Sequence, residues 1–162
     1  MSTIRAARGF RVAGLALLLS LGGGSCRHLP FRAPRPPHRV SSPFVEVRAA
    51  SVEAAEAGHG RVAQLRAGLL EALPNASTSA SYVVLFHDRK TYERVRLVRH
   101  SQGHIVRNPF SRRATIHVPE YASQGTLAHE LTHAHFASFW RPLTRFMEEG
   151  VAEYVADELD PS

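Results

Sequence analysis

Apolar positions follow two different patterns along this chain, and together these patterns predict an ordered set of strands and helices. A compact, β-rich apolar run bounded by turn residues is typical of a strand, whereas apolar residues three and four positions apart are typical of a helix. The predicted strands are residues 44–47, 82–86, 104–107 and 114–118. The predicted helices are residues 52–73, 91–98, 123–138 and 142–159. The last two strands are separated by the turn material Asn-Pro-Phe-Ser, which predicts a hairpin.

The first 25 residues are typical of an export signal. Arg5, Arg8 and Arg11 precede a short apolar segment, 12–21, which is too short to span a bilayer because a spanning helix takes about 20 apolar residues. Small residues follow, and then Cys26, the only cysteine, which stands where a bacterial lipoprotein is lipidated. We therefore expect cleavage before Cys26 and a lipid-anchored protein of the bacterial cell envelope. The alternative is an ordinary cleaved signal and a soluble secreted or periplasmic protein.

Residues 26–42 are rich in Pro and Arg and show no period, which predicts an extended linker before a single domain at 43–162. The net charge of +6 is concentrated at the front of the chain. Residues 1–50 hold eight Arg and one acid (+7), and residues 51–162 hold twelve Lys or Arg and thirteen acids (−1). The folded part is therefore not basic, and nucleic acid is not an expected partner.

One segment, His129-Glu-Leu-Thr-His133, carries a metal-binding pattern within the predicted helix 123–138. Two His four positions apart lie about 40° apart around a helix, so both imidazoles face one way and can bind one Zn²⁺. Glu130 reaches the same cleft and is suited to take a proton from zinc-bound water, whose pKa is about 7 at such a site. The alternative is an amphipathic helix whose polar face is rich in His.

A catalytic zinc with one open position needs a third protein ligand. The next predicted helix offers the run Glu148-Glu149-Gly150-Val-Ala-Glu153-Tyr. Both Glu148 and Glu149 are candidates for the ligand. A solvated acidic helix face is the alternative for all three carboxylates.

The two motifs resemble those of the gluzincin zinc metallopeptidases, especially their short peptidase-MA-like and minigluzincin forms, over residues 82–156. The resemblance implies that Glu149 is the third zinc ligand, that Glu153 orients a ligand histidine, His129, and that Gly150 lets the two helices approach closely. Full-length peptidases of this type polarise the substrate carbonyl with a Tyr or His from a further subdomain. Only 13 residues follow Glu149, so this role has no match; the nearby candidates are His104, His117, Tyr121 and Tyr154.

We therefore expect an α+β, zincin-like domain in which a small mixed sheet lies beside the active-site helix and the second ligand-bearing helix. The strand 114–118 is expected to be the sheet edge along the cleft, where a peptide or protein substrate adds as an extended strand. With one Zn²⁺ bound, Glu130 would act as the general base in peptide hydrolysis. Three possibilities stay open: an inactive zinc-stabilised binding or scaffold lipoprotein, a zinc hydrolase of non-peptide substrates, and a partner that completes the cleft.

Overall fold

The structure is a computed structural model that describes residues 34–97, 99–107, 113–137 and 143–160. The predicted signal segment 1–25, Cys26 and the first part of the predicted linker lie outside these residues. In the part of the chain that is described, no helix combines the length and the apolar character needed to cross a membrane.

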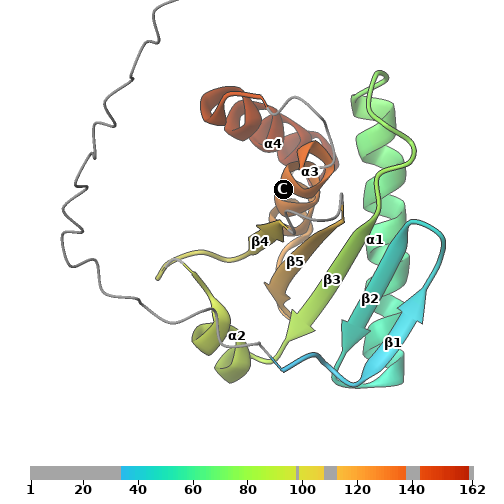
Figure 1. The fold of residues 1–162 in the computed structure, drawn as a ribbon, viewed down its shortest axis with the longest axis vertical. Helices are drawn as coiled ribbons and strands as arrows, with labels where there is room; N and C mark the ends of the chain where they lie inside the picture. The colour runs from blue at the N-terminus through green and yellow to red at the C-terminus, as the bar shows by residue number, and fades with distance from the viewer. Residues whose placement is uncertain (1–33, 98, 108–112, 138–142, 161–162) are drawn as a thin grey trace, which may run out of the picture.

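A five-stranded sheet in the order β1-β2-β3-β5-β4 forms the frame of the domain (Figure 1). β2, β3 and β5 run parallel to one another, whereas β1 and β4 pair antiparallel with their single neighbours at the two edges. The predicted hairpin and the mixed α+β character are thereby confirmed. The strands are β1 (His38–Ser41), β2 (Val45–Ala49), β3 (Tyr82–His87), β4 (His104–Arg107) and β5 (Ala114–Pro119).

The predicted edge strand is wrong, because β4 and not β5 lies at the sheet edge beside the helices. β5 pairs with β3 on one side and with β4 on the other. Its side chains are buried apart from half-buried Thr115, while Val106 and Arg107 of β4 are exposed. Burial along nearly the whole strand, polar His117 included, is consistent with a strand that has a neighbour on each side and both faces covered.

The predicted linker also ends too late, since β1 lies within it. Val40 pairs with Val47 of β2, and the Arg39 guanidinium forms an ion pair with Glu46 at 3.3 Å. No local period indicated this strand. Its stability comes from pairing with a neighbouring strand, which single-sequence patterns do not report.

Each helix begins at a polar side chain that accepts a hydrogen bond from a backbone N–H of its first turn. The four helices are α1 (Val52–Ala72), α2 (Arg89–Val95), α3 (Gln124–Phe136) and α4 (Arg145–Leu159), and their caps are Ser51, Asp88, Ser123 and Thr144. α4 starts later than predicted because Thr144 caps it. α2 starts earlier and is shorter than predicted, because Asp88 caps it.

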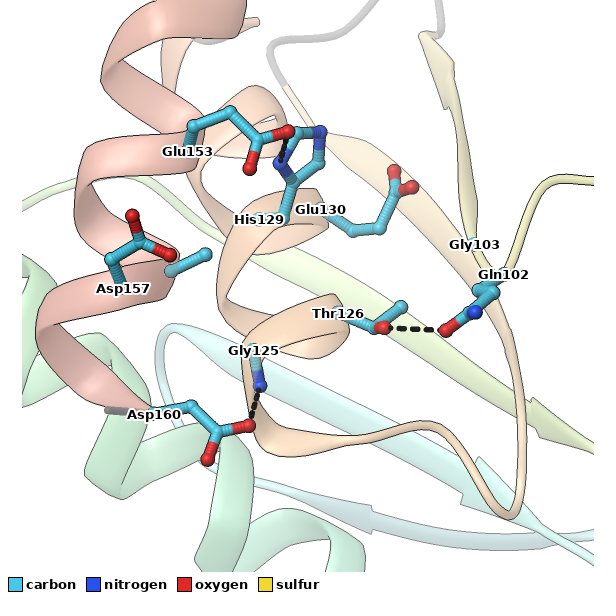
Figure 2. A pocket seen from close by; sticks show the side chains of 10 residues that line it. Gln102, Gly103, Gly125, Thr126, His129, Glu130, Glu153, Asp157 and Asp160 are labelled. Carbon is cyan, nitrogen blue, oxygen red and sulfur yellow. Dashed lines mark hydrogen bonds and ion pairs between the residues drawn. The ribbon is translucent and has the colours of Figure 1, made fainter. Parts of the chain in front are cut away.

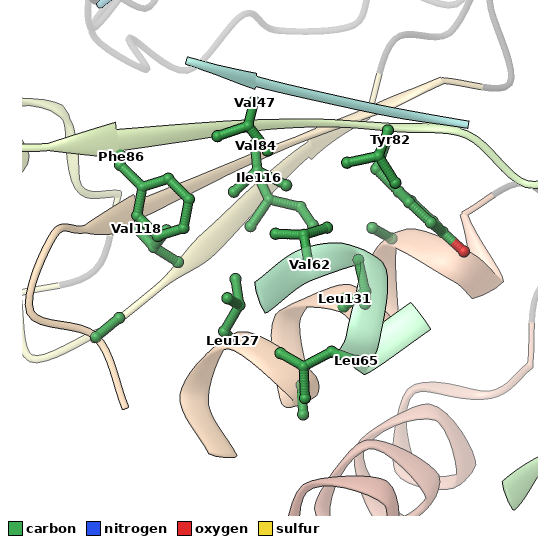
Figure 3. Packing of buried hydrophobic residues seen from close by; sticks show 14 of the residues in the cluster. Val47, Val62, Leu65, Tyr82, Val84, Phe86, Ile116, Val118, Leu127 and Leu131 are labelled. Atoms are coloured by element: carbon green, nitrogen blue, oxygen red, sulfur yellow. The ribbon is translucent and has the colours of Figure 1, made fainter. Parts of the chain in front are cut away.

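The hydrophobic core lies between the sheet and the helices α1 and α3 (Figure 3). α3 contributes Leu127 and Leu131, both fully buried. Because these residues fix one face of α3 against the sheet, the face that carries His129 and His133 turns toward α4 and the edge strand. Three adjacent strands and α1 supply most of the other core side chains, and α4 adds Val155; among those of the strands and α1 are Val47, Val84, Ile116, Val62 and Leu65.

Candidate metal centre

Three ligand atoms from α3 and α4 converge at one point. Nε2 of His129 lies 3.0 Å from Nε2 of His133, and Oε2 of Glu149 lies 3.6 Å and 3.3 Å from these two nitrogens. A tetrahedral metal with bonds of about 2.0–2.1 Å places neighbouring ligand atoms about 3.3 Å apart. Three electron-rich atoms this close repel one another unless a proton or cation lies between them. The group could therefore hold a metal ion.

The helices position these residues through ordinary local structure. His129 and His133 are one turn apart on α3, with ring centroids 4.7 Å apart and ring planes at 70°, and the next helix in sequence, α4, packs along α3 and carries Glu149 near its start. The His133 side chain is 12% exposed, whereas that of Glu149 is 46% exposed. The site is therefore shielded from solvent at His133 on α3 and exposed to solvent at Glu149 on α4.

Glu148 takes a different role from Glu149, which separates the two candidate ligands. Its Oε1 lies 3.0 Å from Nδ1 of His133, on the side of the ring that faces away from the proposed ion. The same carboxylate accepts a hydrogen bond from Arg107 of β4. A carboxylate on Nδ1 holds the proton there and leaves Nε2 free to bind a metal.

His129 has a similar but looser support from Glu153. Oε1 of Glu153 lies 3.5 Å from Nδ1 of His129 (Figure 2), and the Glu153 side chain is 69% exposed. This is the contact that the family resemblance implied. Burial lowers the pKa of His129, and the neighbouring His133 lowers it further, so the neutral imidazole that binds metals is favoured.

Glu130 lies beside the three ligand atoms and does not belong to them. Figure 2 shows its side chain extending from α3 toward Gly103, at the start of the edge strand. Burial raises the pKa of Glu130 to about 7. A carboxyl group that titrates near neutral pH can both accept and return a proton, which is what a general base needs.

Two hollows meet at Glu130. One, of about 370 Å³, has an acidic wall on α4, and the other, of about 520 Å³, has a wall that includes two arginines. Gly103, His129 and Glu130 line both hollows, so the two hollows adjoin at these residues. The acidic wall of the smaller hollow is Glu153, Asp157 and Asp160. The larger hollow is lined by Arg107, Leu143 and Arg145 together with the carboxylates of Glu148 and Glu149.

The other candidate residues lie in different environments. His135 points away from the metal group, and its Nδ1 lies 2.6 Å from the Tyr82 hydroxyl in the interior. Tyr121 and Tyr154 are both more than half exposed. His104 and His117 are buried and stack on each other, with centroids 4.8 Å apart.

Gly150 does not have the implied packing role. A Cβ atom built on it would meet no heavy atom within 4 Å, so space remains where a close contact between helices was expected.

The predictions missed Gly103 and Arg107. No sequence motif contains either residue, and both join the site only through the position of β4.

Comparison with known proteins adds no family: no protein-family model, curated protein or solved structure matches the chain. The gluzincin resemblance stays a prediction from the two sequence motifs.

Proposed function

We propose that this protein is a zinc-dependent peptidase in which His129, His133 and Glu149 hold the metal and Glu130 is the general base. The observation that carries the proposal is the tetrahedral spacing of the three ligand atoms next to a carboxyl group outside the ligand set. Two imidazoles and one carboxylate are a donor set that suits Zn²⁺ and leaves one position open.

The chain's own residues supply the remaining steps. When bound, zinc lowers the pKa of water and polarises a carbonyl group. Glu130 accepts the proton that the attacking water loses and returns it to the leaving amine. Glu148 and Glu153 keep the ligand imidazoles in the tautomer and orientation that binding requires.

The cleft supports a peptide as the substrate class. Within the described residues β4 pairs only with β5, so its outer edge offers backbone groups to an extended peptide. The hollows on both sides of Glu130 can receive side chains on either side of the scissile bond.

We also propose, from the sequence alone, export to the cell envelope with a lipid anchor on Cys26.

An inactive, zinc-stabilised binding protein is the second candidate. It is favoured because Tyr121 and Tyr154, two of the four candidates for polarising the carbonyl, are exposed, and neither lines the two hollows. Of the other two, His117 is buried in the stack with His104 and lines neither hollow, whereas His104, also buried, lines the larger hollow beside Glu130.

Glu130→Gln separates the two candidates. We expect the variant to bind zinc as the unsubstituted protein does, because Glu130 is not a ligand, and to lose about 100- to 10,000-fold in peptide hydrolysis, because a general base is removed. Zinc content is measured by elemental analysis and hydrolysis with a peptide library. The control is Glu158→Gln, an exposed position on α4. Stoichiometric zinc without hydrolysis in the unsubstituted protein would favour the binding protein, and full activity of Glu130→Gln would contradict the assigned base.

A further inference from the structure

We propose that Gly103 is a positioning residue for Glu130, because the space left by its missing side chain is the space that the Glu130 side chain occupies. The inference rests on the proposed function of Glu130. A Cβ atom built on Gly103 would lie 2.5 Å from Cγ, 2.8 Å from Oε1 and 2.9 Å from Cδ of Glu130. Nonbonded carbon atoms are most stable about 3.5–4.0 Å apart, so a methyl group and the present Glu130 conformation exclude each other.

The backbone at Gly103 is held from two directions, so it does not readily move aside. The Tyr92 hydroxyl of α2 donates to the Ser101 backbone carbonyl at 3.3 Å, and the Ser101 hydroxyl donates to the Gly103 carbonyl. From the side of α3, the Thr126 hydroxyl donates to the side-chain oxygen Oε1 of Gln102 at 3.0 Å. Figure 2 shows the Thr126 contact next to Glu130. On the other side, β4 begins immediately after Gly103 and pairs with β5.

The Gly103 backbone N–H adds a local contact to the Ser101 hydroxyl at 3.3 Å. With the segment before β4 fixed in this way, the group that yields to an added methyl is the Glu130 side chain. It can rotate into the adjoining hollows, so the fold need not change. A displacement of about 1 Å at a reacting group can cost about 100-fold in rate.

The glycines of helix α1 differ from Gly103 in what they face. Cβ atoms built on Gly58 and Gly68 would meet the apolar side chains of Phe86 and Leu159, which is a packing relation. A Cβ atom on Gly60 of α1 would meet no atom within 4 Å. Gly60→Ala is therefore a matched control that adds the same methyl group without a contact.

The experiment compares Gly103→Ala with Gly60→Ala in four measurements: kcat, KM, zinc affinity by chelator competition, and a crystal structure of the variant. For Gly103→Ala we expect kcat to fall about 100-fold, while KM and zinc affinity change less than about threefold, because the metal ligands are untouched. The crystal structure should show Glu130 rotated away from the edge strand. Gly60→Ala should leave kcat, KM and zinc affinity unchanged.

Several outcomes would overturn the inference. An active protein whose Gly103→Ala variant keeps its kcat, or a variant that loses zinc, shows that Gly103 does not act through Glu130. If the unsubstituted protein hydrolyses no peptide, the proposed peptidase function is rejected, but the inference about Gly103 can still be tested. In that case, a crystal structure of Gly103→Ala in which Glu130 has not moved would show that Gly103 does not position Glu130. If Gly103→Ala lowers the melting temperature, adding Glu130→Ala should restore it, and a failure to restore it is also contrary evidence.

Discussion

Two groups of histidines in this protein differ in how their rings are arranged. His129 and His133 lie on one helix with ring planes at 70°, and their Nε2 atoms converge on a carboxylate oxygen. His87, His104 and His117 lie on three neighbouring strands, on the sheet face opposite the core. Their rings stack almost in parallel, with interplanar angles of 7° for His87 and His117 and 6° for His104 and His117.

The two groups also differ in whether their ligand atoms converge. Among the described residues, the ligand atoms of His129, His133 and Glu149 all lie within 4.8 Å of one another, whereas His87, His104 and His117 form no such group. His87 and His117 instead form a hydrogen bond with each other, between Nε2 of His87 and Nδ1 of His117 at 3.1 Å. The number of histidines in a group therefore does not indicate metal binding, whereas the convergence of their ring nitrogens on one point does.

The surroundings differ as well. Glu148 and Glu153 face the outer nitrogens of His133 and His129, which is the support that metal-binding imidazoles need. The stacked group is instead dominated by burial, which lowers the pKa of His117 to about 3 and that of His104 to about 4. These rings are neutral parts of a packed layer.

The most direct way to break this comparison is to remove one histidine from each group. His133→Leu should weaken zinc binding on the order of 1,000-fold, because one of three ligands is lost. His117→Leu, the matched control, should bind zinc as the unsubstituted protein does. Competition with a fluorescent chelator measures both affinities. A large loss in His117→Leu as well would mean that the stacked group contributes to the metal site.

Features set by local spacing could be predicted from the sequence. The positions of His129 and His133 one turn apart depend only on helix geometry, and the predicted helices 52–73 and 123–138 form within two residues of their predicted ends. Glu149 could be proposed for the same reason. Its choice over Glu148 came only from the family resemblance, because it depends on how α4 is rotated against α3.

Features set by contacts distant in sequence could not be predicted. The Arg107 to Glu148 hydrogen bond joins residues 41 positions apart, and no periodicity marks such a pair. The edge strand was misassigned because hydrophobicity indicates burial of a strand and does not give its neighbours. The stack of His104 on His117 likewise follows from the register of β4 and β5.

A finer comparison lies within the metal-binding pair, where the two supports differ in burial. Glu148→Gln should lower zinc affinity by about 10- to 100-fold, because the carboxylate on His133 is buried and close. Glu153→Gln should have the smaller effect, since Glu153 is mostly exposed and 3.5 Å from His129. Chelator competition at constant pH measures both. Equal losses in the two variants would show that burial of the supporting carboxylate does not matter.

The smallest expected effect concerns the stacked histidines and the pH dependence of stability. His117 and His104 stay neutral in the folded protein down to about pH 3 and pH 4, whereas in the unfolded chain a histidine takes up a proton near pH 6.5. The unfolded state therefore binds more protons below pH 6.5. The stabilising contribution of these rings is complete above that pH and is lost as the pH falls toward 4 and 3.

Replacing His117 with Leu should flatten this dependence, because the unfolded variant has one proton fewer to gain. Each such proton accounts for at most about 1.4 kcal/mol of unfolding free energy per pH unit. Urea unfolding between pH 7 and pH 4, with a chelator present to remove proton competition at the metal group, measures the slope. His100→Leu, at an exposed position, is the matched control. If His117→Leu keeps the full slope while neutral-pH stability is unchanged, the stacked rings are not the neutral layer inferred from their burial, and the contrast with the metal-binding pair must rest on ring orientation alone.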